Sequence, residues 1–314
     1  MRILITGCMG YIGSALCEEL TKKYEVTGVD MLYYKEQHNA SLLKLVNKSN
    51  FTFCWENLGQ KHLLDKHPEW LEHDIFIFLH ALVGAPLCAR CPNQAYHYNF
   101  RSIKEFVEKL DKNQKIIYPN SNSSYGTAGK EICTELTPVN PISVYSRSKM
   151  MTETFLLNNH KNSTILRLAT VFGTSTRPRF DLLVNDWAAE AYYNSRLEIF
   201  ECNARRNFVH INDVVRAFIW CINPNIIGLY NVGLDSANCT KLELAKRINN
   251  IVGCDIIEKD GEDPDKRDYI VSSQKFMDTG FEFKHSLEQG ITEVVNLCQY
   301  FTKGEIDKMG NYVG

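Results

Sequence analysis

Hydrophobic residues in the first half of the chain form short runs, separated by stretches long enough to hold helices. Met1–Thr6 is such a run, and helical spacing of apolar residues follows over Ser14–Lys23. Further strand-like runs are Glu25–Asp30, Phe51–Trp55, Ile75–Leu79, Lys115–Tyr118 and Ser163–Leu168. Strands alternating with helices predict an α/β fold, with βαβ units and a doubly wound parallel sheet buried on both faces.

The pattern changes after about residue 173. Longer helical patterns cover Leu182–Tyr193, Asp213–Ile222 and Lys241–Ile251, with β-like runs at Leu197–Phe200 and Leu229–Val232. This pattern of longer helices and short strands predicts a smaller C-terminal α/β lobe. We expect residues 1–172 to form the first domain, with 206–232 returning to it, and 173–205 and 233–314 to form the second. The polar tail at Lys303–Gly314 is expected to fray.

Composition narrows the class of protein. The 314 residues are 44% hydrophobic, enough for one large core or two small ones. Lys and Arg total 35 against 37 Asp and Glu, without a basic run, which argues against nucleic acid as a partner. No apolar run approaches the roughly 20 residues that cross a bilayer, and the opening one is too short for a secretory signal. We therefore expect a cytoplasmic protein with no membrane partner.

The eleven cysteines are scattered and odd in number, unlike a disulfide framework. Cys88 and Cys91 form a C-x-x-C, but no second pair lies at zinc-site spacing. We expect structural thiols and no metal.

A glycine-rich turn lies between the first predicted strand and the first helix. Gly7, Gly10 and Gly13 have G-x-x-G-x-x-G spacing. Glycine lets the backbone turn tightly and lets a pyrophosphate approach without a Cβ in the way. The N–H groups and dipole of the following helix, which opens with Tyr11 and Ile12, would then bind the phosphates.

Asp30 ends the second predicted strand, 17 residues after Gly13. A carboxylate there, followed by Met31, can accept both ribose hydroxyls of NAD and would repel the 2′-phosphate of NADP. No Arg or Lys follows within four residues. The predicted cofactor is therefore NAD.

Tyr145 and Lys149 form a Tyr-x-x-x-Lys, which places a phenol and an amine on one helical face. A phenol is a poor base at pH 7, but a nearby ammonium and the positive nicotinamide ring would both favour the phenolate. Tyr145 could then take a hydroxyl proton while hydride leaves the same carbon. Ser121 follows the run ending at Tyr118, at the expected cofactor edge of the sheet, where its hydroxyl can orient the reacting oxygen.

These motifs make the chain similar to the extended short-chain dehydrogenases/reductases, specifically the NAD-dependent nucleotide-sugar epimerase/dehydratase family, over nearly its whole length. The resemblance implies a Rossmann-type first domain. It implies that Ser121 is the catalytic serine and Ser123 a second hydroxyl. It also implies that Tyr145 and Lys149 contact the cofactor, with further cofactor contacts at Asn57, Leu58, Leu79, His80, Ala81, Asn99 and Leu168. Asn57 stands where the family usually has an aspartate that holds the adenine.

The resemblance extends to the second lobe. Arg206, in an R-N-F-V-H-I-N-D segment, and Arg267 resemble the two family arginines that contact a substrate diphosphate. Paired guanidiniums suit that role because their forks match phosphate oxygens. Asn185 is expected to hydrogen-bond the same nucleotide, and Val83 to line the sugar.

One departure limits the chemistry that the resemblance implies. The family's dehydratases have an acidic pair where this chain has Asn122 and Ser123, so dehydration is disfavoured. The leading hypothesis is hydride transfer at C4 of a nucleotide sugar, by a 4-epimerase or by a 4-dehydrogenase that releases a 4-keto sugar. Alternatives are a dehydratase or reductase, and a non-catalytic NAD-binding regulator. Cys88 could serve a C3/C5 epimerase as acid/base, although a packed thiol is favoured.

The substrate is expected to be a UDP-, GDP- or dTDP-linked sugar. The small, apolar Val83-Gly84-Ala85 stretch leaves room for a bulky sugar such as the heptose of a GDP-heptose. The resemblance also implies a homodimer formed through two helices per subunit, one of which carries Tyr145.

Overall fold

The structure, a computed structural model, describes residues 1–34, 39–261 and 267–311. The chain divides into two compact units, each built from three segments. Unit 1 comprises Met1–Ser121, Pro141–Arg167 and Val215–Tyr230, and unit 2 comprises Asn122–Asn140, Leu168–Val214 and Asn231–Gly314. Residues 122–140 thus belong to unit 2, whereas the sequence patterns grouped them with the first domain. The domain boundaries proposed from the sequence stay a proposal.

Unit 1 is organised around a seven-stranded sheet in the order β12-β7-β5-β4-β1-β2-β3. Its strands are β1 (Arg2–Thr6), β2 (Glu25–Asp30), β3 (Phe51–Trp55), β4 (Ile75–Phe78), β5 (Lys115–Ser121), β7 (Ser163–Leu168) and β12 (Gly228–Val232). The neighbours from β3 across to β5 pair in parallel. The chain runs outward from β1 in one direction and then in the other, so the predicted doubly wound α/β fold is confirmed.

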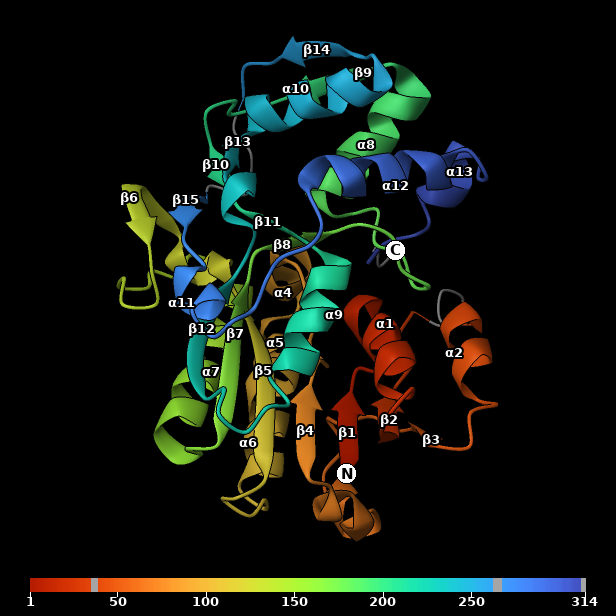
Figure 1. The fold of residues 1–314 in the computed structure, drawn as a ribbon, viewed down its shortest axis with the longest axis vertical. Coiled ribbons are helices and arrows are strands. Elements are labelled where there is room, and N and C mark those ends of the chain that lie inside the picture. The colour runs from red at the N-terminus through yellow and green to blue at the C-terminus, as the bar shows by residue number, and fades with distance from the viewer. Residues whose placement is uncertain (35–38, 262–266, 312–314) are drawn as a thin grey trace. The chain divides into compact units, whose positions relative to one another are not determined.

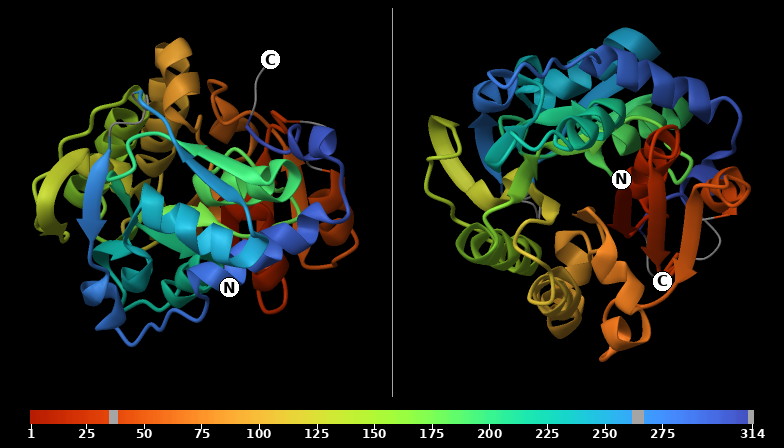
Figure 2. Two further views of the ribbon diagram at one scale, coloured as in Figure 1. Left: turned by 90° about the horizontal axis from the view of Figure 1, so that it is seen from above. Right: turned by 60° about the horizontal axis from the view of Figure 1, so that its bottom comes forward.

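Helices lie on both faces of this sheet (Figures 1 and 2). On one face are α1 and α9, and on the other α5, α6 and α7. The helices of this unit are α1 (Tyr11–Leu20), α2 (Asn39–Leu45), α3 (Leu63–Lys66), α4 (Ala85–Arg90), α5 (Pro92–Tyr96), α6 (Ser102–Val107) and α7 (Val144–Asn159). Helix α9 (Ile211–Trp220) belongs to this unit from Val215 onward. Every residue of β4 and β7 is buried, as expected for strands covered on both sides.

Unit 2 is built from short strand pairs and longer helices. The strands are β6 (Thr127–Cys133), β8 (Thr170–Phe172), β9 (Arg196–Ile199), β10 (Arg205–Arg206), β11 (Phe208–His210), β13 (Cys239–Thr240), β14 (Asp255–Glu258) and β15 (Asp268–Val271). The helices are α8 (Leu183–Asn194), α10 (Lys241–Val252), α11 (Gln274–Met277), α12 (Leu287–Cys298) and α13 (Lys303–Ile306). Parallel pairs are β6 with β15, β8 with β11 and β9 with β14, whereas β10 and β13 are antiparallel.

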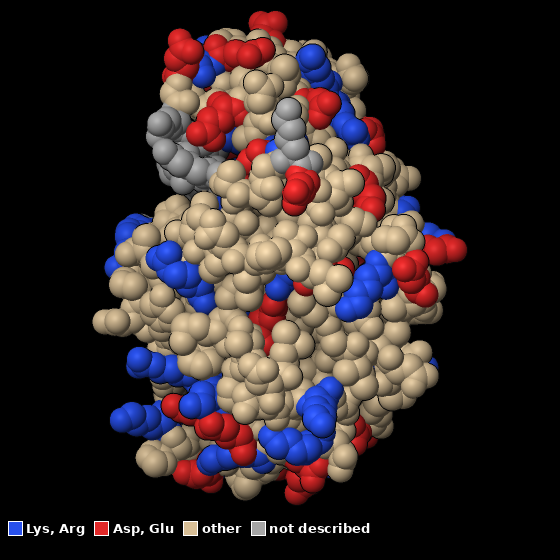
Figure 3. Space-filling view, turned by 90° about the vertical axis from the view of Figure 1, so that its left-hand side faces the viewer, with Lys and Arg blue, Asp and Glu red and all other residues tan. Residues whose placement is uncertain are grey.

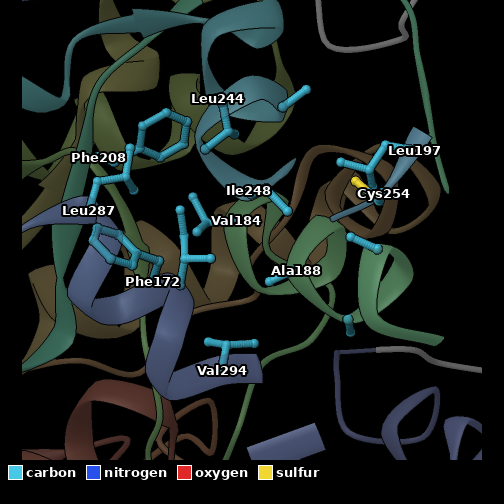
Figure 4. Packing of buried hydrophobic residues seen from close by; sticks show 14 of the residues in the cluster. Phe172, Val184, Ala188, Leu197, Phe208, Leu244, Ile248, Cys254, Leu287 and Val294 are labelled. Carbon is cyan, nitrogen blue, oxygen red and sulfur yellow. The ribbon is translucent and has the colours of Figure 1, made fainter. Parts of the chain in front are cut away.

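The core of unit 2 lies among α8, α10 and α12, where Val184, Leu244 and Val294 pack with Phe172 and Phe208 (Figure 4). The tail was expected to fray, but α13 forms at Lys303–Ile306 because the Thr302 side chain caps it in a reciprocal capping box with Glu305. Residues 312–314 of that tail lie outside the described residues.

The remaining composition-based expectations concern membranes, cysteines and charge. Among the described residues, no helix is both long and apolar enough to span a bilayer. All eleven cysteines are free thiols. On the face shown in Figure 3, basic side chains are interspersed with acidic ones rather than gathered into a stripe.

Candidate active site

The glycine turn after β1 is a tightly packed piece of backbone. Gly7 has φ +72°, and a Cβ there would lie 2.6 Å from the backbone nitrogen of His80. A Cβ on Gly13 would lie 2.2 Å from the carbonyl oxygen of Gly7. Both positions therefore require glycine, as the sequence predicts.

The first turn of α1 suits an anion. Gly10 is the N-cap and offers no side chain, and no acidic residue lies in the first turn. The backbone N–H groups of a helix's first turn point toward its N-terminus, and here that turn begins with Tyr11 and Ile12. Together with the helix dipole they fit the pyrophosphate of a dinucleotide.

Asp30 is buried at the end of β2, beside this turn. Its Oδ2 accepts from the Met9 N–H at 3.0 Å, and its Oδ1 accepts from the Leu32 N–H at 2.8 Å. Each carboxylate oxygen keeps acceptor capacity after one such bond. The carboxylate is thus held in place and still able to accept ribose hydroxyls, so the residues here fit NAD. Met31, the next residue, is half-buried.

We expect Asp30→Asn to weaken the preference for NAD over NADP by about 10–100-fold, because a hydrogen bond to a charged group contributes about 1.5–3 kcal/mol. The amide keeps the shape of the side chain but no longer repels a 2′-phosphate. The ratio of the two Kd values, measured by calorimetry, checks this, with Asp111→Asn as an exposed control. An unchanged ratio would remove Asp30 from the cofactor site.

Asn57, expected near the adenine, has both ends of its amide engaged. Its Oδ1 accepts from the Gly59 N–H at 2.8 Å, and its Nδ2 donates to the Tyr98 hydroxyl at 3.2 Å. These bonds shape the turn after β3, where Leu58 packs against the core of unit 1. Adenine contact by these two residues stays a prediction.

The segment after β4 is tied to its surroundings through His80 and Asn99. The His80 ring contacts the Thr6 hydroxyl at 2.6 Å and the Ser102 hydroxyl at 3.1 Å. Burial first, and the positive charge of Lys149 second, lower the pKa of His80 to about 3, so the ring stays neutral. Leu79 and Ala81 flank it and are half-buried.

The amide of Asn99 is buried and fully bonded. It accepts from the Leu82 N–H at 2.7 Å and donates to the Leu82 carbonyl at 3.0 Å and to the Ser148 hydroxyl at 2.9 Å. These bonds join the loop that leads to Val83 to helix α7. Val83 is half-buried in that loop.

Helix α7 carries both predicted catalytic side chains. Tyr145 is half-buried and Lys149 is buried, and Glu153 follows at the same four-residue spacing on the same face. Burial lowers the pKa of Lys149 to about 7, an effect that Cys88 partly opposes. Cys88 itself is a packed thiol that donates to the Leu82 carbonyl, and burial raises its pKa to about 12. This geometry favours the packed-thiol interpretation of Cys88.

Ser121 ends β5 and is held against α7 by a buried network that the sequence did not reveal. The Ser121 N–H donates to the Asn120 side-chain oxygen at 2.8 Å, and the Asn120 amide donates to Glu153 at 2.5 Å. Arg167 on β7 donates to both oxygens of Glu153, at 3.1 and 2.5 Å. Strand β5, which ends in Ser121, and helix α7, which carries Tyr145 and Lys149, are thereby joined through side chains.

Other predicted residues lie in unit 2. Ser123 is buried in a 3₁₀ turn over Asn122–Tyr125, and Leu168 is buried at the end of β7. The Asn185 amide accepts from the Gly173 N–H and donates to the carbonyls of Gly173 and Arg179, so it braces the start of α8. Nucleotide contact by Asn185 stays a prediction.

The two predicted phosphate arginines are neighbours in unit 2. The guanidinium of Arg206, on β10, donates to the backbone carbonyl of Arg267. Beside them, Arg205 donates to both carboxylate oxygens of Asp268 at 2.9 and 2.7 Å, which fastens β10 to β15. The two guanidinium-bearing segments are thus brought together, as a diphosphate site requires.

A glycine turn between β1 and α1, with a carboxylate at the end of β2, defines an NAD-binding protein of the doubly wound α/β class. The chain belongs to the NAD dependent epimerase/dehydratase family, whose profile matches residues 3–233. The predicted family, its enzymatic class and NAD as cofactor are thereby confirmed.

Individual relatives cover four-fifths of this chain or more. Protein CapI of Staphylococcus aureus is 26% identical, over 96% of this chain and all of its own length. The uncharacterized UDP-glucose epimerase YtcB of Bacillus subtilis is 28% identical, over 81% of this chain and 83% of its own. The structure is similar to that of the UDP-glucose 4-epimerase of Thermotoga maritima, solved with UDP-glucose. That match has a TM-score of 0.82 and 25% identity, over 96% of this chain and 99% of the other.

Proposed function

We propose that this protein is a 4-epimerase of a UDP-linked sugar. The observation that carries the proposal is the side-chain arrangement on α7 and β5, where Tyr145 and Lys149 share a helical face that is bonded to the strand ending in Ser121. Two relatives, the Bacillus subtilis and Thermotoga maritima proteins, are named for UDP-glucose epimerisation, and both cover more than four-fifths of this chain.

Proton transfer is the part of the reaction that the chain's own residues perform. The phenolate of Tyr145 takes the proton of the C4 hydroxyl, and the Ser121 hydroxyl orients that oxygen. The ammonium of Lys149 favours the ionised form of Tyr145 by its charge. The glycine turn and Asp30 would hold NAD, whose nicotinamide would supply the hydride acceptor and donor for C4. Tyr145 then gives the proton back to the oxygen, and the configuration at C4 is inverted.

The two residues after Ser121 favour epimerisation over dehydration. Water loss needs an acid and a base beside the sugar, and neither Asn122 nor Ser123 can act as a carboxylic acid. In this proposal Arg206 and Arg267 bind the diphosphate of the UDP-sugar. A cytoplasmic location agrees with eleven free thiols, which a reducing compartment maintains.

The proposal is tested by incubating the purified protein with UDP-, GDP- and dTDP-linked sugars, including GDP-heptose. Proton NMR follows the sugar, and absorbance at the nicotinamide band follows the cofactor. Inversion at C4 of a UDP-sugar without net NADH is expected. A ketone accompanied by stoichiometric NADH would instead establish a 4-dehydrogenase, and a 4-keto-6-deoxy sugar, the product of water loss, would overturn the proposal.

We also propose that the enzyme is a homodimer formed through α7 and α5. An open groove of about 520 Å³ lies on this face of unit 1. It is lined by Tyr96, Phe100, Pro141, Arg147, Met150, Met151, Thr154, Phe155 and Asn158. Met151, one of the lining residues, is 42% exposed, so this groove presents a large apolar side chain to solvent that a second copy would cover.

Met151→Glu is expected to convert the dimer to monomer, because it places a charge in an apolar interface. Light scattering coupled to size-exclusion chromatography measures the mass directly. Leu43→Glu on α2 is the matched control, since Leu43 is 71% exposed on a different helix. A wild-type mass of one chain, or a Met151→Glu protein that remains dimeric, would contradict this interface.

A further inference from the structure

Lys149 lies over the face of an aromatic ring that the catalytic motif does not include. Its Nζ is 4.0 Å from the centre of the Tyr118 ring. Tyr118 is in β5, three residues before Ser121, and Lys149 is in α7, four residues after Tyr145. Both side chains are buried, so water does not screen their interaction. An ammonium over a desolvated ring is attracted by the negative face of the π system.

The groups around Lys149 give it little other compensation for its charge. Glu153, the carboxylate four residues further along α7, is paired with Arg167 at 2.5 Å instead. Cys88 on α4 has a pKa raised to about 12 and is a neutral thiol at pH 7, while His80 after β4 is neutral as well. Besides Cys88, His80 and Tyr118, the remaining titratable neighbour is Tyr145 on the same helix. The Tyr118 ring is therefore the principal electron-rich surface offered to the ammonium before the cofactor binds.

Tyr118 is unsuited to act as the base itself. Burial raises the pKa of Tyr118 well above its ordinary value, and the neighbouring Tyr145 raises it further. Its phenol stays protonated at neutral pH, so the ring contributes its π face rather than a negative charge.

We propose that Tyr118 is a positioning residue whose ring holds the ammonium of Lys149 in place and favours its charged form. The proposal rests on the proposed function, in which Lys149 promotes ionisation of Tyr145. It assigns the aromatic side chain in β5 a part in the proton chemistry, exerted through Lys149 rather than as an acid or base itself.

The first test measures the ionisation of Lys149 without any substrate. The protein is labelled with [¹³Cε]lysine, and the Lys149 signal, assigned by its loss in Lys149→Arg, is followed over pH by NMR. In Tyr118→Leu the midpoint should fall by about one pH unit, since a desolvated cation–π contact contributes roughly that much. In Tyr118→Phe, which keeps the ring, the midpoint should match the wild type.

The second test follows turnover. At pH 7.5, Tyr118→Leu should lower kcat about tenfold, and the pH dependence of kcat should shift in the same direction as the Lys149 midpoint measured by NMR. Tyr118→Phe should keep the wild-type kcat and the wild-type pH dependence. If Tyr118→Leu does not fold, phenylalanines with increasing fluorine substitution incorporated at position 118 weaken the π face with little change of shape. The midpoint should then fall step by step.

Equal midpoints for the wild type and the Leu variant, or for the fluorinated series, would overturn this inference even if epimerisation is found. The converse outcome is equally informative. A midpoint that moves as expected in a protein that turns over no UDP-sugar would leave the Tyr118–Lys149 contact standing and discard the proposed function instead.

Discussion

Replacing Tyr145 with phenylalanine is expected to lower kcat by about 10²–10⁴-fold, the usual contribution of a positioned general base. The substitution removes one oxygen and leaves the ring that packs in α7. The glycine turn and Asp30 are separate from it in the sequence and remain in place. The Kd for NAD should therefore stay within about threefold of the wild-type value, a change of well under the 1.4 kcal/mol that corresponds to a factor of ten. Steady-state kinetics on the sugar found in the substrate screen, together with calorimetric titration of NAD, measures both quantities.

Tyr300→Phe is the matched control for this experiment. Tyr300 is 80% exposed and follows α12 by two residues, so the same chemical change there should leave kcat unaltered. If Tyr145→Phe turned over substrate as fast as the wild type, Tyr145 would not be the base. If it lost NAD binding as well as turnover, the phenol would be acting mainly in the cofactor site.

The elements that could be predicted from sequence are those that carry a local signal. β2, β3 and β7 begin and end at the predicted residues. β7 is buried at every residue, whereas β3 is an edge strand with Trp55 exposed, so the signal that these strands share is their local content of β-branched, aromatic and other apolar residues rather than burial. The glycine turn was equally readable, since Gly7 and Gly13 leave no room for a side chain. The strand pairs of unit 2 could not be predicted in this way. Strands β10 and β13 have two residues each, which is too short to show an alternation of apolar and polar residues.

Most of the contacts in the candidate site that could not be predicted from the sequence join residues that are far apart along the chain. Nothing in the pattern around Asn120 indicates that its amide bonds to a glutamate 33 positions later. The same holds for the ring of Tyr118 beneath Lys149. Glu153 continues the spacing of Tyr145 and Lys149 on α7, and this was the one available signal that it faces the same strand.

Removal of the Glu153 carboxylate is expected to be the most destabilising single change in unit 1. Glu153 is 2% exposed, and its partner Arg167 on β7 is 4% exposed. Glu153→Leu would remove the carboxylate that pairs with the buried guanidinium of Arg167 and that accepts from the Asn120 amide. Breaking a buried pair in this way costs about 3–5 kcal/mol, so the urea midpoint should fall sharply.

The double variant Glu153→Leu/Arg167→Met separates the cost of an uncompensated charge from the loss of a specific contact. An apolar pair of similar volume avoids the desolvation of both ions, and such replacements are often neutral, so most of the lost stability should return. Activity should not return with it, because Asn120 would still lack the carboxylate that holds it beneath the Ser121 N–H. Recovery of stability together with full kcat would show that the network supports the fold but does not position Ser121. A Glu153→Leu protein within about 1 kcal/mol of the wild type would refute the buried pair as a determinant of stability.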